Sequence, residues 1–180
     1  MNRTLLKRMI VTSVIAVLGV STSFAALVME RDQSVDTAPS VGMYRFEVPV
    51  ELQGTYNSAG VANLTASMEK EPNTLSMNVA HVKGNPSESY VVEIYKDLAA
   101  IEAHRKSDYY QAFVNEVGSK LTNRKMYDVQ SVLLFEKKDA LSIVNDGKAV
   151  VTLTEFTVDS NEIDTVQRQY QLDMERAVRD

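Results

Sequence analysis

Two residue types, cysteine and tryptophan, are absent from this chain of 180 residues. Without cysteine the protein has no disulfide bond, no thiolate metal ligand, no thiol nucleophile and no lipidated cysteine. Histidine is scarce, since only His81 and His104 occur, so few side chains are suited to exchange a proton near neutral pH. The net charge is −5 and the body holds no basic cluster, which argues against nucleic acid as a partner.

The N-terminus has the pattern of an export signal. Its features are the positive residues Arg3, Lys7 and Arg8, the apolar run Met9 to Val20, and the small residues of Ser23-Phe24-Ala25. We expect residues 1–25 to be a signal peptide and the mature protein to be periplasmic or secreted. The alternative is a membrane anchor that is not cleaved, because Met9 to Met29 is long enough to span a bilayer as a helix. Residues 26–42 are predicted to form a linker.

The body of the chain, residues 43–138, alternates between strand and helix patterns. We predict strands over Tyr44–Leu52, Leu75–His81, Tyr90–Tyr95 and Tyr127–Phe135. We predict helices from an N-cap at Ser58 to the turn before Pro72, over Leu98–Lys106 after an N-cap at Asp97, and from Ser107 or Asp108 to Leu121. Pro49 cannot donate a hydrogen bond to a neighbouring strand, so the first strand should be an edge strand or carry a bulge.

This order, β-α-β-β-α-β, predicts a ferredoxin-like α+β fold. Helices on one face of an antiparallel sheet leave its other face bare, and that face needs a cover. We therefore expect a homodimer in which two sheets meet.

A C-terminal arm, residues 146–180, lies outside this unit. Val150–Val158 is predicted to be a strand, and Asp159-x-x-Glu162 is typical of a capping box before a helix of about five turns. A strand and a helix cannot bury their apolar faces alone. The arm is either the start of a truncated second repeat, a decayed repeat, or an extension that packs on a sheet of its own or of a partner chain.

Residues Ser89 to Val117, together with Glu71-Pro72-Asn73-Thr74-Leu75-Ser76, resemble the antibiotic-biosynthesis-monooxygenase (ABM) family, which includes quinol monooxygenases. The shared features are a Glu-Pro turn after a helix, two strands, and a helix with a histidine followed by a Ser-x-x-aromatic step. The resemblance covers roughly Met43 to Lys138. It implies a dimeric α+β barrel and an arm that is similar to the beginning of a second ABM repeat.

His104 is the residue that the resemblance marks for catalysis. It lies three residues after Ile101 and six after Leu98 and so should face inward, where it could act as a general base toward a phenolic substrate. It could equally be a half-buried histidine bound to a carbonyl or carboxylate.

Further residues are candidates for binding a substrate. They are Tyr95, Tyr109, Tyr110, His81 and Glu93. The tyrosines could line a flat aromatic pocket, or they could be packing residues whose hydroxyl groups contact solvent. His81 could be an ordinary histidine at a strand end, and Glu93 could lie in the cavity or at a dimer seam. The carboxylates of Glu30, Glu47, Glu51, Glu69 and Glu71 read as solvated.

We expect no cofactor and no metal. No cluster has the spacing of metal ligands, and neither a phosphate loop nor a dinucleotide fingerprint is present. In a haem-degrading branch of the family, the axial histidine falls near Val114, which cannot bind iron.

Two functions remain open. The first is an exported, cofactor-independent monooxygenase of quinol or polyphenol substrates in a barrel cavity. The second is a dimeric barrel without catalysis that binds a small ligand or a protein partner at the cell envelope. An isomerase or a sugar-processing relative is a weaker third reading.

Overall fold

The computed structural model describes residues 7–15, 39–136 and 150–179. The chain divides into two compact units, which we describe separately. Unit 1 combines Met1–Glu30 with Val132–Asp180, and unit 2 is Arg31–Ser131.

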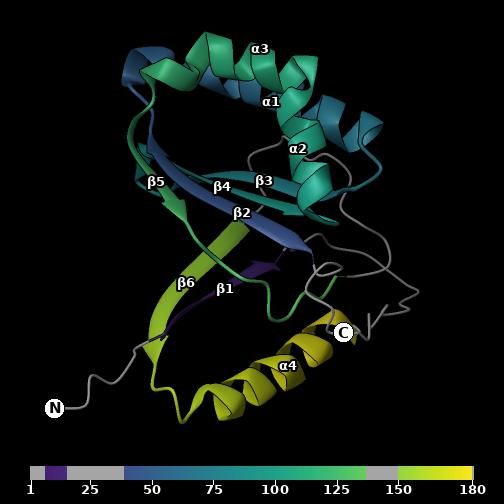
Figure 1. The fold of residues 1–180 in the computed structure, drawn as a ribbon. Coiled ribbons are helices and arrows are strands. Elements are labelled where there is room, and N and C mark those ends of the chain that lie inside the picture. Colours follow the sequence, from purple (N-terminus) through teal and green to yellow (C-terminus); the bar gives the residue numbers. More distant parts are fainter. Residues whose placement is uncertain (1–6, 16–38, 137–149, 180) are drawn as a thin grey trace, which may run out of the picture. The chain divides into compact units, whose positions relative to one another are not determined.

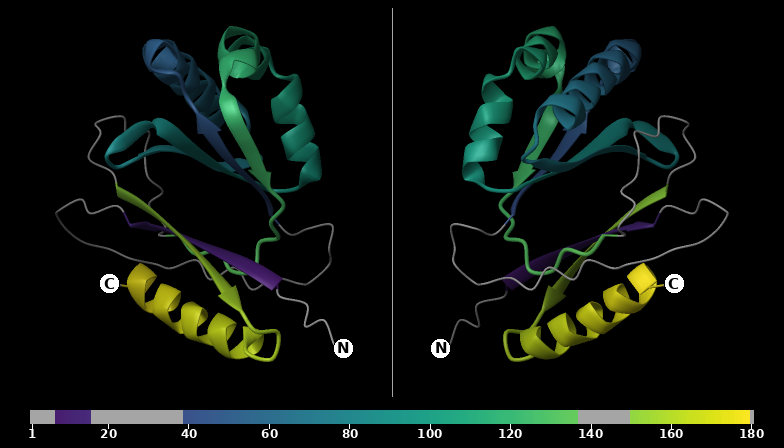
Figure 2. Two further views of the ribbon diagram at one scale, coloured as in Figure 1. Left: turned by 90° about the vertical axis from the view of Figure 1, so that its left-hand side faces the viewer. Right: turned by 90° about the vertical axis from the view of Figure 1, so that its right-hand side faces the viewer.

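Unit 2 is a four-stranded antiparallel sheet with helices on one face (Figures 1 and 2). Its elements are β2 (Ser40–Glu47), α1 (Gln53–Lys70), β3 (Thr74–Val82), β4 (Asn85–Tyr95), α2 (Leu98–Lys106), α3 (Asp108–Val117) and β5 (Thr122–Tyr127). The spatial order is β3-β4-β2-β5. This order and the helical layer confirm the predicted ferredoxin-like fold.

Local capping explains where the two middle helices begin. The Asp97 side chain accepts a hydrogen bond from the Ala100 backbone N–H at 2.8 Å, which caps α2 at the predicted residue. Ser107 has an extended backbone, ends α2, and accepts a hydrogen bond from the Tyr110 N–H at 3.3 Å. One residue thus separates the two helices and caps the second.

Two predicted boundaries near the start of unit 2 are wrong. β2 is a central strand between β4 and β5, not an edge strand; its pairing with β5 shifts register between Arg45 and Glu47, and it ends at Glu47, before Pro49. The apolar alternation up to Leu52 continues past the strand into a single 3₁₀ turn, Val50–Leu52, where Leu52 is buried by helical geometry. α1 then begins at Gln53, so Gly54 lies inside the helix.

The predicted last strand is also misplaced. β5 spans Thr122–Tyr127, whereas residues 128–136 form no strand. A connection of only a few residues brings the chain from α3 back beside β2, so pairing begins before the apolar run that suggested Tyr127–Phe135. β5 is an exposed edge strand, and such strands show no buried alternation.

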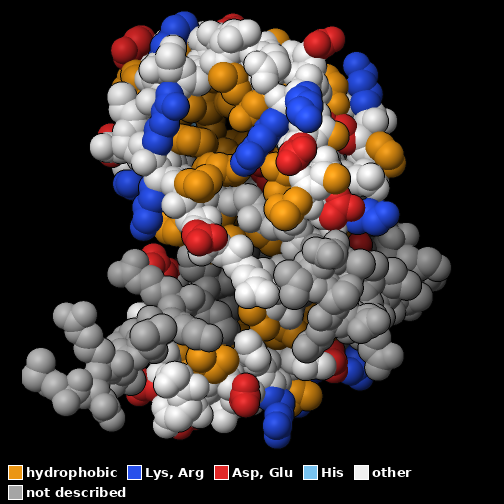
Figure 3. Space-filling view, in the orientation of Figure 1, with side chains coloured by type: hydrophobic (Ala, Val, Ile, Leu, Met, Phe, Trp, Pro, Cys, Tyr) orange, Lys and Arg blue, Asp and Glu red, His pale blue; other side chains and the backbone are white. Residues whose placement is uncertain are grey.

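The core of unit 2 lies between the sheet and the helices. Its buried members are Val48, Leu52, Tyr56, Val117 and Leu121. The Tyr56 hydroxyl lies 2.9 Å from the Ser89 hydroxyl and joins α1 to β4. Apolar side chains also reach the surface of this unit, with Lys and Arg around them (Figure 3).

The described residues of unit 1 form a two-stranded antiparallel sheet and one helix. β1 (Lys7–Ile15) pairs with β6 (Val150–Val158), and α4 (Ile163–Arg179) follows. The rings of Phe156 and Tyr170 stack at 5.5 Å and fix α4 against β6. The strand and helix predicted for the arm are confirmed, whereas its origin as a second repeat stays a prediction. No described helix is long and apolar enough to cross a membrane.

Candidate functional site

A cavity of about 90 Å³ lies between the sheet and the helices of unit 2. Strands β2, β3 and β4 and helices α1, α2 and α3 all contribute to its wall. The residues that line it are Tyr44, Phe46, Tyr56, Gly60, Asn63, Leu64, Val79, Val91, Glu93, His104, Arg105, Tyr110 and Phe113. The cavity is therefore on the helix side of the sheet, within one protomer, and not on the bare face where we expected a second copy to enclose it.

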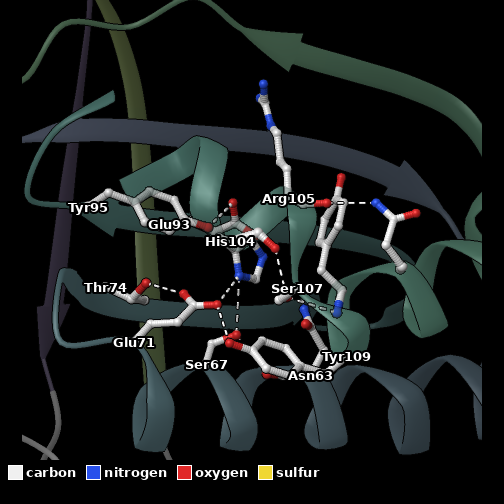
Figure 4. A network of polar contacts seen from close by, with 12 residues as sticks. Asn63, Ser67, Glu71, Thr74, Glu93, Tyr95, His104, Arg105, Ser107 and Tyr109 are labelled. Atoms are coloured by element: carbon white, nitrogen blue, oxygen red, sulfur yellow. Dashed lines mark hydrogen bonds and ion pairs between the residues drawn. The ribbon is translucent and has the colours of Figure 1, made fainter. Parts of the chain in front are cut away.

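His104 lies at the centre of a polar network in this cavity (Figure 4). Its side chain is 1% exposed, and its Nδ1 lies 3.0 Å from Glu71 Oε1 and 3.3 Å from Ser67 Oγ. A carboxylate can only accept, so Nδ1 carries a proton. Nε2 is buried and has no partner in the part of the chain that the structure describes.

Glu71 is not solvated, contrary to the prediction. Its side chain is 13% exposed and accepts hydrogen bonds from the Thr74 hydroxyl, the His104 ring and the Tyr109 hydroxyl, the last at 2.6 Å. Burial acts to raise the pKa of Glu71, but these three hydrogen bonds outweigh it and hold the pKa below its usual value. Glu71 is therefore ionised and fixes the ring of His104.

The half-buried Glu93 and the buried Tyr95, both from β4, form a second pair. The Tyr95 hydroxyl donates to Glu93 Oε2 at 3.0 Å. Burial raises the pKa of Glu93, although His104, Tyr95 and Arg105 partly oppose it. Burial, followed by the nearby Glu93 carboxyl, also raises the pKa of Tyr95. The Tyr95 ring lies 5.6 Å from that of His104, so the pair adjoins the histidine, and its member Glu93 lines the cavity.

The two neighbouring tyrosines of α3 have different positions. Tyr110 lines the cavity, and its ring meets that of His104 edge-on at 4.8 Å. Tyr109 reaches Glu71 instead, and burial and that hydrogen bond raise its pKa. Tyr109 thus supports the carboxylate, and Tyr110 faces the cavity.

His81 is the one candidate that the fold does not bring to the site. It is exposed, its Nε2 lies 3.1 Å from Asn57 Oδ1, and it does not line the cavity.

Sequence reasoning missed three residues of the site. Asn63, Ser67 and Glu71 follow one another at intervals of four; Asn63 and Ser67 lie one turn apart on α1, and Glu71 is the residue that ends it. That polar i, i+4, i+8 pattern is the signal that could have found them. In the described ranges, no group of three or more acidic or histidine side chains could hold a metal ion.

The fold and the site define an α+β domain with a buried histidine–carboxylate pair in a small cavity. The sequence model of the antibiotic biosynthesis monooxygenase family matches residues 41–116. This segment belongs to that family. No curated protein matches the chain.

Solved structures support the same fold. A protein from Bacteroides thetaiotaomicron, assigned to the antibiotic biosynthesis monooxygenases, is 21% identical; the alignment covers 53% of this chain and 91% of that one, with a TM-score of 0.51. A protein from Fusobacterium nucleatum, assigned to the monooxygenases, is 19% identical; the alignment covers 62% of this chain and 49% of that one, with a TM-score of 0.53. The chain therefore spans about half the length of the second protein. At these identities the likeness shows the fold, and the chemistry must be argued from the residues.

Proposed function

We propose that this protein is a cofactor-independent monooxygenase that acts on a single-ring quinol. The observation that carries the proposal is the buried His104, whose Nδ1 is held by the ionised Glu71 while Nε2 has no partner among the described residues. With the proton on Nδ1, the lone pair of a neutral imidazole lies on Nε2, where it can accept a phenolic proton.

The size of the cavity supports a small substrate. Its volume of about 90 Å³ is below the roughly 150 Å³ of an apolar protein cavity that takes up benzene. A single ring requires modest movement of the wall, whereas a fused polyphenol would require much more. Apolar lining residues such as Phe46, Val79 and Val91 suit an aromatic ring.

The proposed reaction needs only quinol and dioxygen. His104 Nε2 takes a phenolic proton, and the resulting anion supplies electrons to dioxygen. A carbon–oxygen bond forms at a ring carbon, and the peroxide anion takes the proton back from His104 Nε2 to give a hydroperoxide. Its O–O bond then breaks, the proton on that ring carbon is lost, and water leaves. Quinol and O₂ thus yield a hydroxyquinone and water.

Oxygen uptake with hydroquinone tests this function. We expect uptake, a hydroxylated quinone and no hydrogen peroxide, because an oxidase would instead convert all the oxygen to peroxide. His104→Gln should lower kcat about 10²–10⁴-fold, the usual contribution of a general base. His81→Gln, the same change at an exposed histidine outside the cavity, is the matched control.

Two results would contradict the proposal. No oxygen uptake with any single-ring quinol removes the oxygenase function, and binding of the quinol without uptake would then favour the ligand-binding alternative. Equal rates for the wild type and His104→Gln remove His104 from the mechanism.

Export remains part of the proposal. Its support is the positive N-terminal residues followed by an apolar run and small residues. Cleavage before Ala26 would remove β1, the partner of β6, so cleavage and that pairing cannot occur in one molecule. N-terminal sequencing of the purified protein after cell fractionation decides between them, and an intact Met1 in the cytoplasmic fraction would contradict export.

We also propose that the sheet of unit 2 pairs with that of a second copy. The support is the helices lying on one face only, which leaves the other face to be covered. A molar mass of one chain by light scattering at micromolar concentration would contradict the dimer.

A further inference from the structure

Two residues that line the cavity each carry a buried polar atom without a hydrogen-bond partner among the described residues. The two atoms are Asn63 Oδ1 and His104 Nε2. Asn63 is 4% exposed and His104 is 1% exposed, and both residues line the same cavity. Unpaired polar atoms are rare in protein interiors because each one loses its hydrogen bonds to water. Their occurrence together indicates that a bound molecule completes them.

Both atoms are acceptors. The Oδ1 of an asparagine is a carbonyl oxygen and can only accept. His104 Nε2 accepts in the neutral ring, because the proton lies on Nδ1 between Glu71 and Ser67. The Ser67 hydroxyl cannot provide the missing donor, since it donates to the Asn63 backbone oxygen at 2.8 Å. The ligand must therefore bring one donor for each atom.

We propose that Asn63 is a substrate-binding residue, and that Asn63 and His104 together select small ring compounds with two hydrogen-bond donors over those with one or none. The inference rests on the proposed function in so far as the ring compound is the quinol. It adds to that function Asn63 as the residue that accepts a hydrogen bond from the second hydroxyl of the quinol. It also implies that the hydroxyquinone product, which keeps a single O–H donor, leaves the site more readily than the quinol that entered.

Four compounds of similar size test the selection. Hydroquinone has two donors, 4-methylphenol has one, 1,4-dimethylbenzene has none, and 1,4-cyclohexanedione offers two acceptors. Their affinities are measured by calorimetry without oxygen, so that no turnover occurs. We expect the dione to bind no better than dimethylbenzene. An equal affinity for the dione and hydroquinone would overturn the inference, because the site would then supply donors.

The variant Asn63→Leu identifies the residue. The quantity compared is the ratio of the hydroquinone affinity to the 4-methylphenol affinity in each protein, so that differences in ligand solvation cancel. We expect this ratio to fall about tenfold in Asn63→Leu, the effect of losing one buried hydrogen bond. Asn57→Leu changes an exposed asparagine of the same helix and should leave the ratio unchanged.

Further measurements keep the test decisive. Should Asn63→Leu fail to fold, Asn63→Ala replaces it, and NMR of the wild type should show the Asn63 side-chain amide signals shifting with hydroquinone and not with 4-methylphenol. An unchanged ratio in both variants, absence of that shift, or no binding of hydroquinone at all would overturn the inference. A water molecule that completes both acceptors permanently would produce the first two results.

The outcome is separable from that of the proposed function. Selective binding of hydroquinone without oxygen uptake would contradict the oxygenase function and support the inference about Asn63. The opposite outcome is oxygen uptake together with equal binding of the one-donor and two-donor compounds in the wild type and the variants. It would contradict the inference about Asn63 and support the oxygenase function.

Discussion

Replacing Glu71 by glutamine is the most direct test of the histidine–carboxylate pair. The change keeps the size of the side chain and removes its charge. In the wild type the carboxylate accepts from Thr74, Tyr109 and His104, with 3.0 Å between His104 Nδ1 and Glu71 Oε1. A glutamine has one accepting oxygen and one donating nitrogen, so it cannot accept from all three groups in the same way.

The expected effect on catalysis is large. A glutamine amide that donates to Nδ1 would move the ring proton to Nε2, the atom that must accept the phenolic proton. In serine proteases the corresponding loss of the carboxylate that orients a histidine lowers kcat by about 10⁴-fold. We expect Glu71→Gln to lower kcat by about 10²–10⁴-fold while the cavity keeps its shape.

The expected effect on stability is smaller. Hydrogen bonds to a charged group contribute roughly 1.5–3 kcal/mol each, and the glutamine retains part of each of them. We expect the free energy of unfolding to fall by about 1–3 kcal/mol. Urea denaturation measures this loss, and oxygen uptake with hydroquinone measures kcat.

The control is Glu69→Gln, the same change at an exposed residue two positions earlier. It should alter neither quantity. A folded Glu71→Gln protein with kcat within threefold of the wild type would refute the role that we give to the carboxylate.

The pH dependence of stability provides an independent check. Because the folded-state pKa of Glu71 is lowered by its hydrogen bonds, its contribution is present above the pKa of the unfolded chain, about 4.3. It is lost as the pH falls through the lower, folded-state pKa. The stability difference between the wild type and Glu71→Gln should therefore shrink below about pH 4.

Two further substitutions test other parts of the site. Burial raises the pKa of Glu93, so the wild type should lose stability as the pH rises from the unfolded-state pKa through the folded-state pKa. Glu93→Gln should remove this loss, so in urea denaturation it should be more stable relative to the wild type at pH 7 than at pH 4. A stability difference between the two proteins that is the same at both pH values would argue against a strained carboxyl. Asp97→Ala should lower the free energy of unfolding by about 1 kcal/mol, because the Ala100 N–H loses its cap, and should lower kcat because α2 carries His104. Glu102→Ala, exposed on the same helix, should change the unfolding free energy by less than about 0.5 kcal/mol, and an effect equal to that of Asp97→Ala would exclude the cap as the cause.

Elements that depend on local chemistry were predicted well. Asp97 and Ser107 mark the starts of α2 and α3 by capping, and Pro72 excludes further helix after α1. The failures occurred where tertiary contacts overrode the pattern. The alternation up to Leu52 suggested a long strand, but Leu52 is buried in a 3₁₀ turn. β5 has no apolar alternation because it is an exposed edge, so its pairing with β2 could not be read from its own residues.

The candidate site shows the same division. The sequence by itself determined that His104 faces inward through its spacing from Ile101 and the Asp97 cap, whereas Leu98, which was expected on the same face, is 72% exposed. Only the tertiary structure decided that Glu71, the residue after α1, meets it, because 33 residues separate them. The fold likewise left His81 at the surface and joined Asn63 to the cavity. Helical phase depends on neighbouring residues, whereas the partners of a buried polar atom depend on contacts that are distant along the chain.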